Sequence, residues 1–585
     1  MERRLKDFAE STFRLEENEG EDKVVSLGEA IRRNVKPGMV LYITALAALS
    51  EILRQFRGTK PEFTLIDPRG PLALDIVNHG LVKKVISTGA RILNLPNRKE
   101  EVEVEIWSYA GISQGFLAGA LGTGFIPTRS MIGTSMAEEN KDSFRVIDDP
   151  FGSGKKIGII KALNPDLTII HAWAADRAGN TILAPVTWAV DEWGALASKN
   201  KIVVTVERLV STAFIRQHSP MVRIPGNRVN SVSVVPLGVH PNYMLGWPDV
   251  KEFETYGPDN QFSRKRRAAD RNPESLDAWI KEWVMDCSSH EDYLSKLGDE
   301  RIQTLKKWGR GVAWEDRLSS ILEKVSPSIE YSEREALTVV AARKIKERIL
   351  QKGYEVMLCG GGISSLASWV AYYRLKEEDY LIDLMIGTGF FGFAPRPGDP
   401  ALFNLPTLET CKIMANVVWA YNLVIMGENQ SSISILGTGQ IDKFGNLNSA
   451  KISDELALGG PGGSGDAYQA CETLVAVAQS KDRFLEKVPY ITVPGVGVKT
   501  LVSTLGIFEK LGDDEEFSLT ACLPNSKFST LDKKIKNVKE NCGWELTVAP
   551  KVEEISPPTA EELMTLRLIA PGGPFTRDRV ENDEQ

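Results

Sequence analysis

The stretch Tyr380-Leu-Ile-Asp-Leu-Met-Ile-Gly-Thr-Gly-Phe-Phe-Gly-Phe-Ala-Pro-Arg-Pro397 decides the fold of this chain. Its apolar run, 381–386, predicts a buried strand that ends at a glycine cluster. Gly387, Gly389 and Gly392 have the spacing G-x-G-x-x-G, which in dinucleotide-binding proteins leads directly into a helix. Prolines follow here instead, and proline is unfavourable inside a helix. The stretch therefore predicts a strand, a glycine-lined turn and a stiff exit rather than a dinucleotide site.

Length and composition indicate a multidomain globular protein. The chain has 585 residues, which is more than one hydrophobic core usually supports, so two or more domains are expected. Hydrophobic residues make up 42% and charged residues 25%, both ordinary values for a globular protein. The net charge of −8 argues against nucleic acid or an anionic membrane surface as a partner.

The cysteines and the N-terminus indicate the cellular environment. Six cysteines and five histidines are dispersed, without a C-x-x-C pair or a metal-ligand spacing, so we expect reduced thiols and no metal site. Residues 1–23 are charged and lack the apolar segment of a secretory signal. No apolar run reaches the roughly 18 residues that a membrane span needs. These features predict a soluble, cytoplasmic protein.

An internal duplication organises the chain. Residues 167–180 and 433–446 share one pattern, in which an apolar strand is followed by an aspartate, two residues and Gly-Asn. Ser26 and Ser332 each begin a capping box, and each of the two helices is followed by a predicted strand. Repeated strands and helices in two similar halves predict α/β domains with largely parallel sheets.

The chain divides into four parts by composition and pattern. Residues 250–325 are rich in charged residues and tryptophan at helical spacing, and we interpret them as a helical cap or linker. The basic run 264–267 within them is interpreted as a solvated helix face, because the chain is acidic overall. The predicted parts are an acidic leader at 1–24, a first domain at 25–320 with the cap from about 250, a second domain at 330–575 and a charged tail at 576–585.

Several strings, taken in order, resemble family I coenzyme A (CoA) transferases of the glutaconate CoA-transferase branch. The active-site turn in the second subunit of that family reads Ser-Glu-Asn-Gly, two apolar residues, Gly, an apolar residue, Gly and Pro, and residues 389–395 match its later part. Residues 25–320 resemble the first subunit, whereas residues 330–575 resemble the second, so the chain looks like a fusion of the two. Further matching strings are 224–230, 234–241, 459–466, 491–498 and 502–508.

The resemblance implies a fold and a substrate class. It implies two pseudo-symmetric, open α/β domains of the family I type, with the active site where they meet. The implied substrate is an acyl-CoA thioester, with coenzyme A as part of the substrate and no other bound cofactor. The nucleophilic glutamate of the family would fall at Gly387, which has no side chain.

Three explanations of the missing glutamate stay open. Another carboxylate could serve in ordinary CoA transfer, or the chain could be a non-catalytic, CoA-binding relative. Alternatively, the scaffold could carry out carbon–carbon bond hydrolysis or decarboxylation of a CoA thioester. The second half is also similar to the steroid ring-opening CoA hydrolases, on residues 424–430, 442–446 and 566–579.

Candidate site residues follow from the residue types and from the resemblance. The candidate catalytic carboxylates are Glu105 and Glu428, although an exposed strand residue and a turn cap are the ordinary roles for such positions. Arg129 could bind a second carboxylate of the substrate, because arginine suits bidentate contacts. Glycine turns could offer amides to a thioester oxygen or to CoA phosphates. The predicted substrate-binding set is Gly360, Gly361, Gly362, Gly387, Gly389, Phe391, Gly392, Arg129, Ser135, Gly462 and Gly463.

We predict that the protein is a homo-oligomer, specifically a dimer, because the resembling proteins pair their halves and acidic globular chains of this size commonly form symmetric dimers. Light scattering over a range of concentrations should give a mass of about twice the 64.6 kDa of one chain. A particle of 64.6 kDa at every concentration would contradict the prediction.

Overall fold

The computed structural model describes most of residues 2–577. Most of the predicted charged tail lies outside the described residues. The segments that are not described are 1, 68–73, 96–101, 186–190, 247–249, 251, 254, 310–313, 429, 512–514, 526 and 578–585.

The first half is built on a nine-stranded, mostly parallel sheet. Its order is β11-β9-β8-β1-β2-β3-β4, and β10 pairs with β8 on one side and with β12 on the other. β8 is buried along its whole length, as a strand covered on both faces must be. The strands are β1 (Val40–Ile43), β2 (Phe63–Asp67), β3 (Val82–Ser87), β4 (Glu103–Ile106), β8 (Leu167–Ala175), β9 (Thr181–Ile182), β10 (Ile202–Leu209), β11 (Val222–Ile224) and β12 (Val229–Val234).

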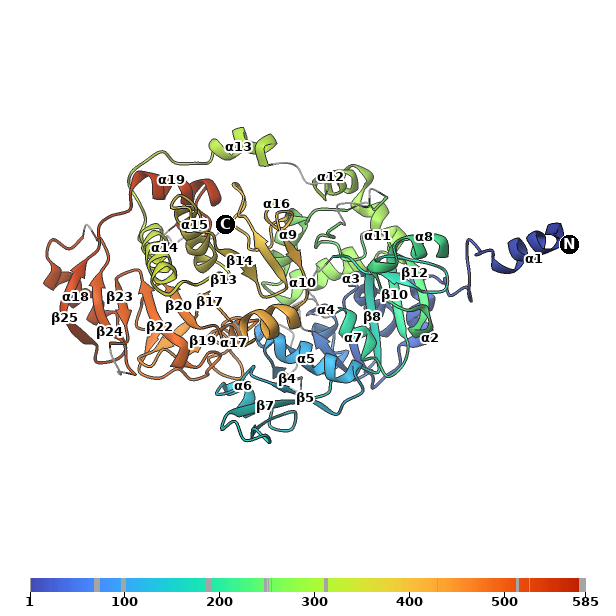
Figure 1. The fold of residues 1–585 in the computed structure, drawn as a ribbon, viewed down its shortest axis with the longest axis horizontal. Helices are drawn as coiled ribbons and strands as arrows, with labels where there is room; N and C mark the ends of the chain where they lie inside the picture. Colours follow the sequence, from blue (N-terminus) through green and yellow to red (C-terminus); the bar gives the residue numbers. More distant parts are fainter. Residues whose placement is uncertain are drawn as a thin grey trace.

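The second half is built on a ten-stranded sheet of order β16-β15-β14-β13-β17-β20-β22-β23-β24-β25. Figure 1 shows this sheet in yellow to red, beside the blue and green first half. The strands are β13 (Val356–Cys359), β14 (Asp383–Ile386), β15 (Phe390–Phe393), β16 (Ile413–Met414), β17 (Ser432–Leu436), β20 (Glu472–Val477), β22 (Val498–Ser503), β23 (Gly506–Glu509), β24 (Ser518–Cys522) and β25 (Thr547–Glu554).

The predicted duplication is present in the topology. The parallel series β2-β1-β8-β10-β12 of the first half repeats as β14-β13-β17-β20-β22 in the second. After the repeated Asp-x-x-Gly-Asn string, Asp176 accepts bonds from the backbone and side chain of Asn180 at 2.9 and 2.8 Å. Asp442 and Asn446 repeat both bonds at 3.0 and 3.1 Å. The same short motif therefore closes the same turn in each half.

The long helices begin where the sequence predicts. α14 (Glu333–Lys352) begins with a complete capping box, in which Ser332 Oγ and the Glu335 amide lie 3.0 Å apart and the Glu335 carboxylate accepts from the Ser332 amide at 3.0 Å. At α2 (Leu27–Asn34) only half of the box forms, because the Glu29 carboxylate pairs with Arg32 and Arg33 instead. α15 (Ile363–Lys376) packs on α14, and its buried Trp369 lies in the core of the second half.

The glycine stretch forms an antiparallel hairpin. β14 pairs with β15 across the turn at 387–389, so no helix follows the glycines and the dinucleotide interpretation is excluded. Gly389 has φ of +106°, and a Cβ there would lie 2.4 Å from the Ala415 carbonyl oxygen. Gly392 has φ of +68°, and a Cβ there would contact the Lys412 side chain. Both positions therefore require glycine, because Ala415 and Lys412 of the same chain approach them too closely for a side chain.

Residues 258–309, within the segment 250–325 for which a helical cap or linker is expected, form a group of helices on the first half, here called the helical cap. Its elements are α9 (Asn260–Ala269), α10 (Pro273–Ile280), a π-helix η5 (Lys281–Met285), α11 (His290–Leu297) and α12 (Asp299–Gly309). The basic run is a solvated face at 264, 265 and 267, but Arg266 turns inward to pair with Asp75 and Asp270. The expectation for that run therefore fails at one residue.

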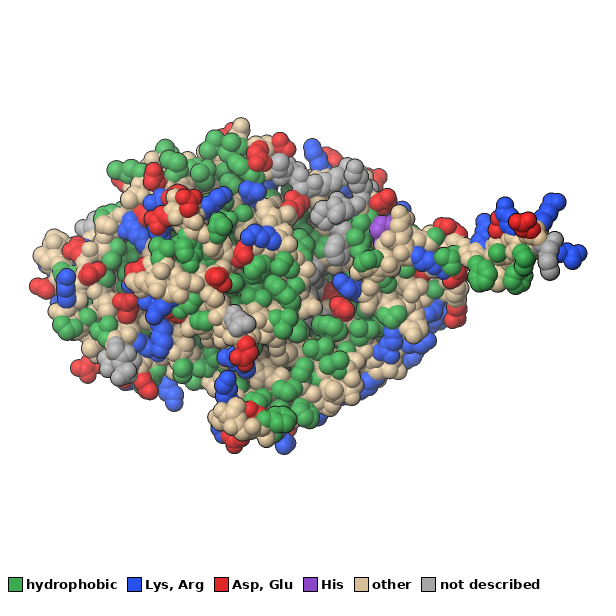
Figure 2. Space-filling model, viewed as in Figure 1, with side chains coloured by type: hydrophobic (Ala, Val, Ile, Leu, Met, Phe, Trp, Pro, Cys, Tyr) green, Lys and Arg blue, Asp and Glu red, His purple; other side chains and the backbone are tan. Residues whose placement is uncertain are grey.

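The N-terminal helix α1 (Glu2–Phe13) has no buried residue and extends away from the body of the molecule (Figure 1). Figure 2 shows acidic, basic and hydrophobic side chains interspersed over the displayed face. Among the described residues, no helix is long and apolar enough to cross a membrane.

Candidate active site

A cleft of about 950 Å³ lies where the two halves meet. The second half contributes the residues that follow β13, β14 and β17, at the carboxyl ends of parallel strands, where ligands of α/β sheets usually bind. The first half contributes Thr88 to Ile92, which follow β3, and Tyr109 at the start of α5 (Tyr109–Ala120). A loop at 458–464 forms another wall. The cleft therefore exists only when the halves are docked.

Backbone hydrogen bonds hold the 458–464 loop against the first half. The Ala90 amide donates to the Gly459 carbonyl at 2.7 Å, and the Gly462 amide donates to the Thr88 carbonyl at 3.1 Å. The Tyr109 amide donates to the Gly462 carbonyl at 2.9 Å. Both walls of the cleft are thus joined by main-chain contacts that depend on geometry rather than on side-chain identity.

Asp466 is a buried carboxylate at this junction. It accepts a hydrogen bond from Ser130 Oγ and another from the Ala110 amide at 2.9 Å, at the N-terminus of α5. Ser108 Oγ lies 2.9 Å from Ser130 Oγ and extends the network. Burial raises the pKa of Asp466 to about 6, although these hydrogen bonds lower it. A carboxylate of the second half therefore caps a helix of the first.

Tyr421 places a phenol hydroxyl in the cleft. It comes from a π-helix, η7 (Val418–Ile425), a rare helix type that is frequent at functional sites. A Cβ at Gly387 would lie 1.9 Å from Tyr421 Oη, and a Cβ at Gly463 would lie 1.7 Å from the same atom. Burial and, to a lesser extent, the charge of Asp466 hold the pKa of Tyr421 well above its ordinary value. The hydroxyl therefore stays protonated, and among the described residues no hydrogen-bond partner of it is found.

Two glycines of the cleft lining have amides without a hydrogen-bond acceptor among the described residues. They are Gly361 and Gly463. Gly361 directly precedes Gly362, the N-cap of α15, so the N-terminal end of that helix points toward the cleft. Unpaired amides and a helix N-terminus favour anionic oxygen atoms.

Cys359, Asp482 and Arg91 are further titratable groups in the cleft lining. Burial raises the pKa of the Cys359 thiol to about 12, so this residue stays a thiol at neutral pH. Asp482 lies on the exposed rim, and Arg91 is exposed on the first-half side. Among the described residues, no group of three or more His, Cys, Asp or Glu could hold a metal ion.

Comparisons with known proteins agree with this architecture. Residues 24–234 match the family model described as Coenzyme A transferase. The chain is 29% identical over 322 residues to the first subunit of glutaconate CoA-transferase from Acidaminococcus fermentans, covering 48% of this chain and 94% of that protein. It is 28% identical over 259 residues to the second subunit of 3-oxoadipate CoA-transferase from Pseudomonas knackmussii, covering 41% and 93%. Both halves of this chain are thus similar to coenzyme A transferases.

The relatives also confirm the predicted fusion, because first and second subunits of such enzymes together match the two halves of this chain. An acyl-CoA transferase of Escherichia coli O157:H7 (YdiF), solved as a thioester complex with CoA, shares the fold. Its TM-score is 0.61 at 16% identity, and the match covers 92% of this chain and 95% of that one. The predicted pair of family I α/β domains is therefore confirmed.

The structure brings five of the predicted binding residues together in the cleft. They are Gly360, Gly361, Gly387, Gly462 and Gly463. Gly362 lies just beyond the lining as the N-cap of α15, and Phe391 packs its ring on Trp419 at 5.6 Å. Gly389 and Gly392 lie in the hairpin beyond the cleft wall.

The two candidate carboxylates and two polar candidates lie away from the cleft lining. Glu105 accepts from Lys84 and from the Trp107 indole, and Glu428 is exposed after η7. Arg129 donates to the Met426 carbonyl at 2.8 Å, at the end of η7. Ser135 exchanges two 2.8 Å hydrogen bonds with the backbone of Ile491. Arg129 and Ser135 thus join the two halves outside the cleft.

Sequence reasoning missed the two residues that dominate the site. Asp466 ends the Gly-rich string 459–466, and an acid in such a string was a detectable signal. Tyr421 had no comparable signal in the sequence. A π-helix has no characteristic spacing of hydrophobic residues, and the glycines that Tyr421 contacts lie 34 and 42 residues away from it in the sequence.

Replacing Asp466 should change how stability depends on pH. The pKa of Asp466 in the folded protein, about 6, lies above the ordinary value of 3.8. The neutral carboxyl group therefore contributes its full stabilisation of the folded protein below pH 3.8, and this stabilisation is lost as the pH rises through about 6. Ionisation in the folded state costs about 3 kcal/mol relative to the unfolded chain. The asparagine in the Asp466→Asn variant cannot ionise. The melting temperature of the wild type minus that of the variant should therefore fall between about pH 4 and about pH 6 and then level off. A difference that is constant over this range would contradict the assignment.

Proposed function

We propose that this enzyme of the CoA-transferase superfamily binds an acyl-CoA thioester in the cleft and transforms it without a glutamyl intermediate at the 387 turn. The supporting relatives are CoA-transferase subunits, and the cleft combines room for a large ligand with glycine amides from its walls. Coenzyme A would enter as part of the substrate, with no other cofactor. We further propose that the protein works in the cytoplasm as a homodimer.

The contact between Tyr421 and Gly387 carries this proposal. By the resemblance of the turn, the family's nucleophilic glutamate would stand at position 387. A Cβ there would lie 1.9 Å from Tyr421 Oη, far inside any non-bonded contact. The phenol hydroxyl thus occupies the space that the first atoms of the glutamate side chain would need, and the two residues exclude each other.

We infer that Tyr421 polarises the thioester carbonyl. Its hydroxyl is protonated, nearly buried and without a partner among the described residues, so it is free to donate to an oxyanion. The unpaired amides of Gly361 and Gly463 line the same cleft and offer further donors. Removing one such donor in other enzymes slows the reaction by about 10²- to 10³-fold.

A donor-rich cleft without a glutamate at position 387 suits chemistry through a thioester enolate. In decarboxylation, the bond from the α-carbon to the carboxylate breaks, carbon dioxide leaves, and the electron pair of the bond moves into the enolate. A water molecule then protonates the α-carbon, which restores the thioester. This sequence needs oxyanion donors and a proton source but no covalent nucleophile. Arg91, which is exposed on the cleft and has no charge partner among the described residues, is suited to bind the substrate's carboxylate or a CoA phosphate.

Ordinary CoA transfer is the alternative, since it is the activity named in the relatives. It would require a glutamate from elsewhere to reach the thioester. The discriminating experiment incubates the protein with a panel of acyl-CoA and dicarboxylyl-CoA thioesters, treats it with hydroxylamine or borohydride, and maps modified carboxylates by peptide mass. We expect thioester turnover without a modified glutamate. A trapped glutamyl adduct together with acetate-dependent CoA exchange would contradict the proposal.

Tyr421→Phe should lower kcat on the substrate found in that panel by about 10²- to 10³-fold, because the ring stays and only the donor is lost. KM should change little if the hydroxyl acts mainly on the transition state. Tyr373→Phe, on α15, is the matched control, since the Tyr373 hydroxyl donates to the Pro395 carbonyl, and it should keep full activity. Equal activity of Tyr421→Phe and the wild type would remove Tyr421 from the mechanism.

A further inference from the structure

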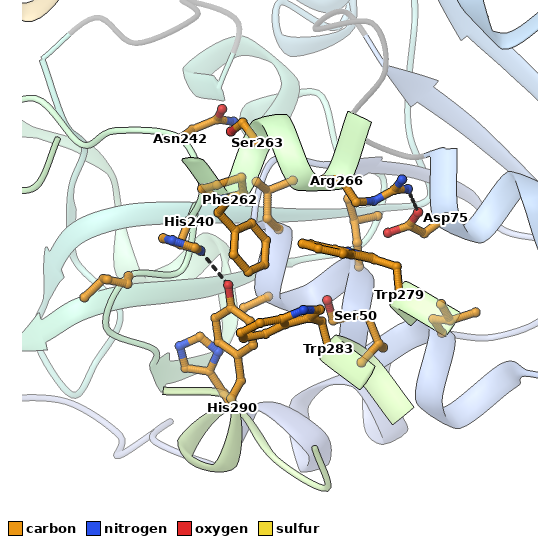
Figure 3. Close-up of a pocket in the computed structure, with 18 of the residues that line it drawn as sticks. Ser50, Asp75, His240, Asn242, Phe262, Ser263, Arg266, Trp279, Trp283 and His290 are labelled. Atoms are coloured by element: carbon orange, nitrogen blue, oxygen red, sulfur yellow. Dashed lines mark hydrogen bonds and ion pairs between the residues drawn. The ribbon is translucent and has the colours of Figure 1, made fainter. Parts of the chain in front are cut away.

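A second cavity, of about 290 Å³, lies within the first half between α3 (Leu46–Phe56) and the helical cap (Figure 3). None of its lining residues lines the cleft between the halves. The cavity is about twice as large as the roughly 150 Å³ cavity that holds a benzene molecule in another protein. It therefore has room for a molecule with one or two rings.

Aromatic side chains from the cap form one wall of this cavity. Phe262 on α9 meets Trp279 and Trp283 edge to face, with ring centroids 4.9 Å apart in both pairs and interplanar angles of 70° and 76°. Leu49 and Leu53 of α3 also line the cavity. Aromatic edges and faces next to aliphatic side chains favour a flat, apolar ligand body.

The charged and polar residues around this wall are already paired with one another. Arg266 pairs with Asp75, as Figure 3 shows, and also with Asp270. His240 bonds to the Tyr293 hydroxyl and, at 3.1 Å, to Asp259. The cavity is present in the structure without any ligand, so binding would require little reorganisation of these paired residues.

Two hydrogen-bond donors at the cavity have no partner among the described residues. They are the indole N–H of Trp283 and the hydroxyl of Ser50, which Figure 3 shows on the same side of the cavity. The hydrogen bond from Arg54 to the Val284 carbonyl, at 3.2 Å, holds α3 beside η5 and so keeps these two donors close. Since an indole N–H can only donate, this end of the cavity favours a ligand with an acceptor group.

An anionic acceptor suits the end of the cavity that Ser50 and Trp283 form. Arg266 is shared between Asp75 and Asp270, so these three residues together carry one net negative charge, which the exposed Arg267 offsets in the cavity lining. Among the described residues, Arg267 has no ion-pair partner. A carboxylate that lies at the Ser50 and Trp283 end would accept from two donors, whereas an ammonium group has no lone pair to accept from either of them.

We propose that this cavity is a second ligand site, which binds an aromatic carboxylic acid of one or two rings. The ring system would lie against Phe262, Trp279 and Trp283, and the carboxylate would accept from Ser50 and Trp283. The site is independent of the acyl-CoA chemistry proposed for the cleft, because the two cavities share no residue.

The test is isothermal titration of the full chain with 2-naphthoate, and with 2-naphthalenemethanol as the uncharged analogue. We expect one saturable site per chain for 2-naphthoate and at least tenfold weaker binding of the alcohol. Trp283→Phe keeps a ring but removes the N–H, and should weaken 2-naphthoate about tenfold. Leu49→Trp fills the cavity and should abolish binding. Trp419→Phe, whose ring packs on Phe391 in the other half, is the matched control and should bind as the wild type does.

The outcomes separate this site from the cleft. Circular dichroism and binding of free CoA verify that each variant is folded with an intact cleft, and Ser50→Phe replaces Leu49→Trp if the latter does not fold. Absence of saturable 2-naphthoate binding to the folded wild type would overturn the proposal. So would undiminished binding to a folded, cavity-filling variant, or displacement of 2-naphthoate by free CoA, which would assign the binding to the cleft.

Discussion

The contact between one phenol hydroxyl and two glycines determines what the cleft can do. Tyr421 Oη lies where a Cβ at Gly387 or Gly463 would be, so the hydroxyl can be there only because both positions lack a side chain. The π-helix that carries Tyr421 contributes to this placement, since its wider turn displaces the residue from where an α-helix would put it. A carboxylate nucleophile and this tyrosine cannot share the site.

The cleft also depends on the docking of two halves that are similar but not identical. Asp466 and the loop before it connect the second half to the N-terminal end of α5 in the first. Burial raises the pKa of this carboxyl group to about 6, so its charge in the folded protein changes near that pH. The same Asp-x-x-Gly-Asn turn recurs at Asp176 and Asp442, yet only the second half carries the glycine hairpin among the residues that the structure describes.

The fold was largely predictable because its signals are local. The repeated Asp-x-x-Gly-Asn string, the capping box at Ser332 and the prolines after the glycine cluster each act within a few residues, and each has the predicted structure. The site was less predictable because its contacts are not local. Ser130 and Asp466 lie 336 residues apart, and a π-helix leaves no periodic signal. The cavity under the cap likewise depends on tertiary packing, which also turned Arg266 inward.

Absence of a side chain at position 387 was visible in the sequence, but what fills the vacated space was not. That question is tested most directly by a crystal structure of the protein with a non-hydrolysable acyl-CoA analogue in which a ketone replaces the thioester. The account predicts the ketone oxygen within hydrogen-bonding distance of Tyr421 Oη, with the analogue in the cleft between the halves. An analogue bound with its ketone oxygen against a glutamate and away from Tyr421 would contradict it.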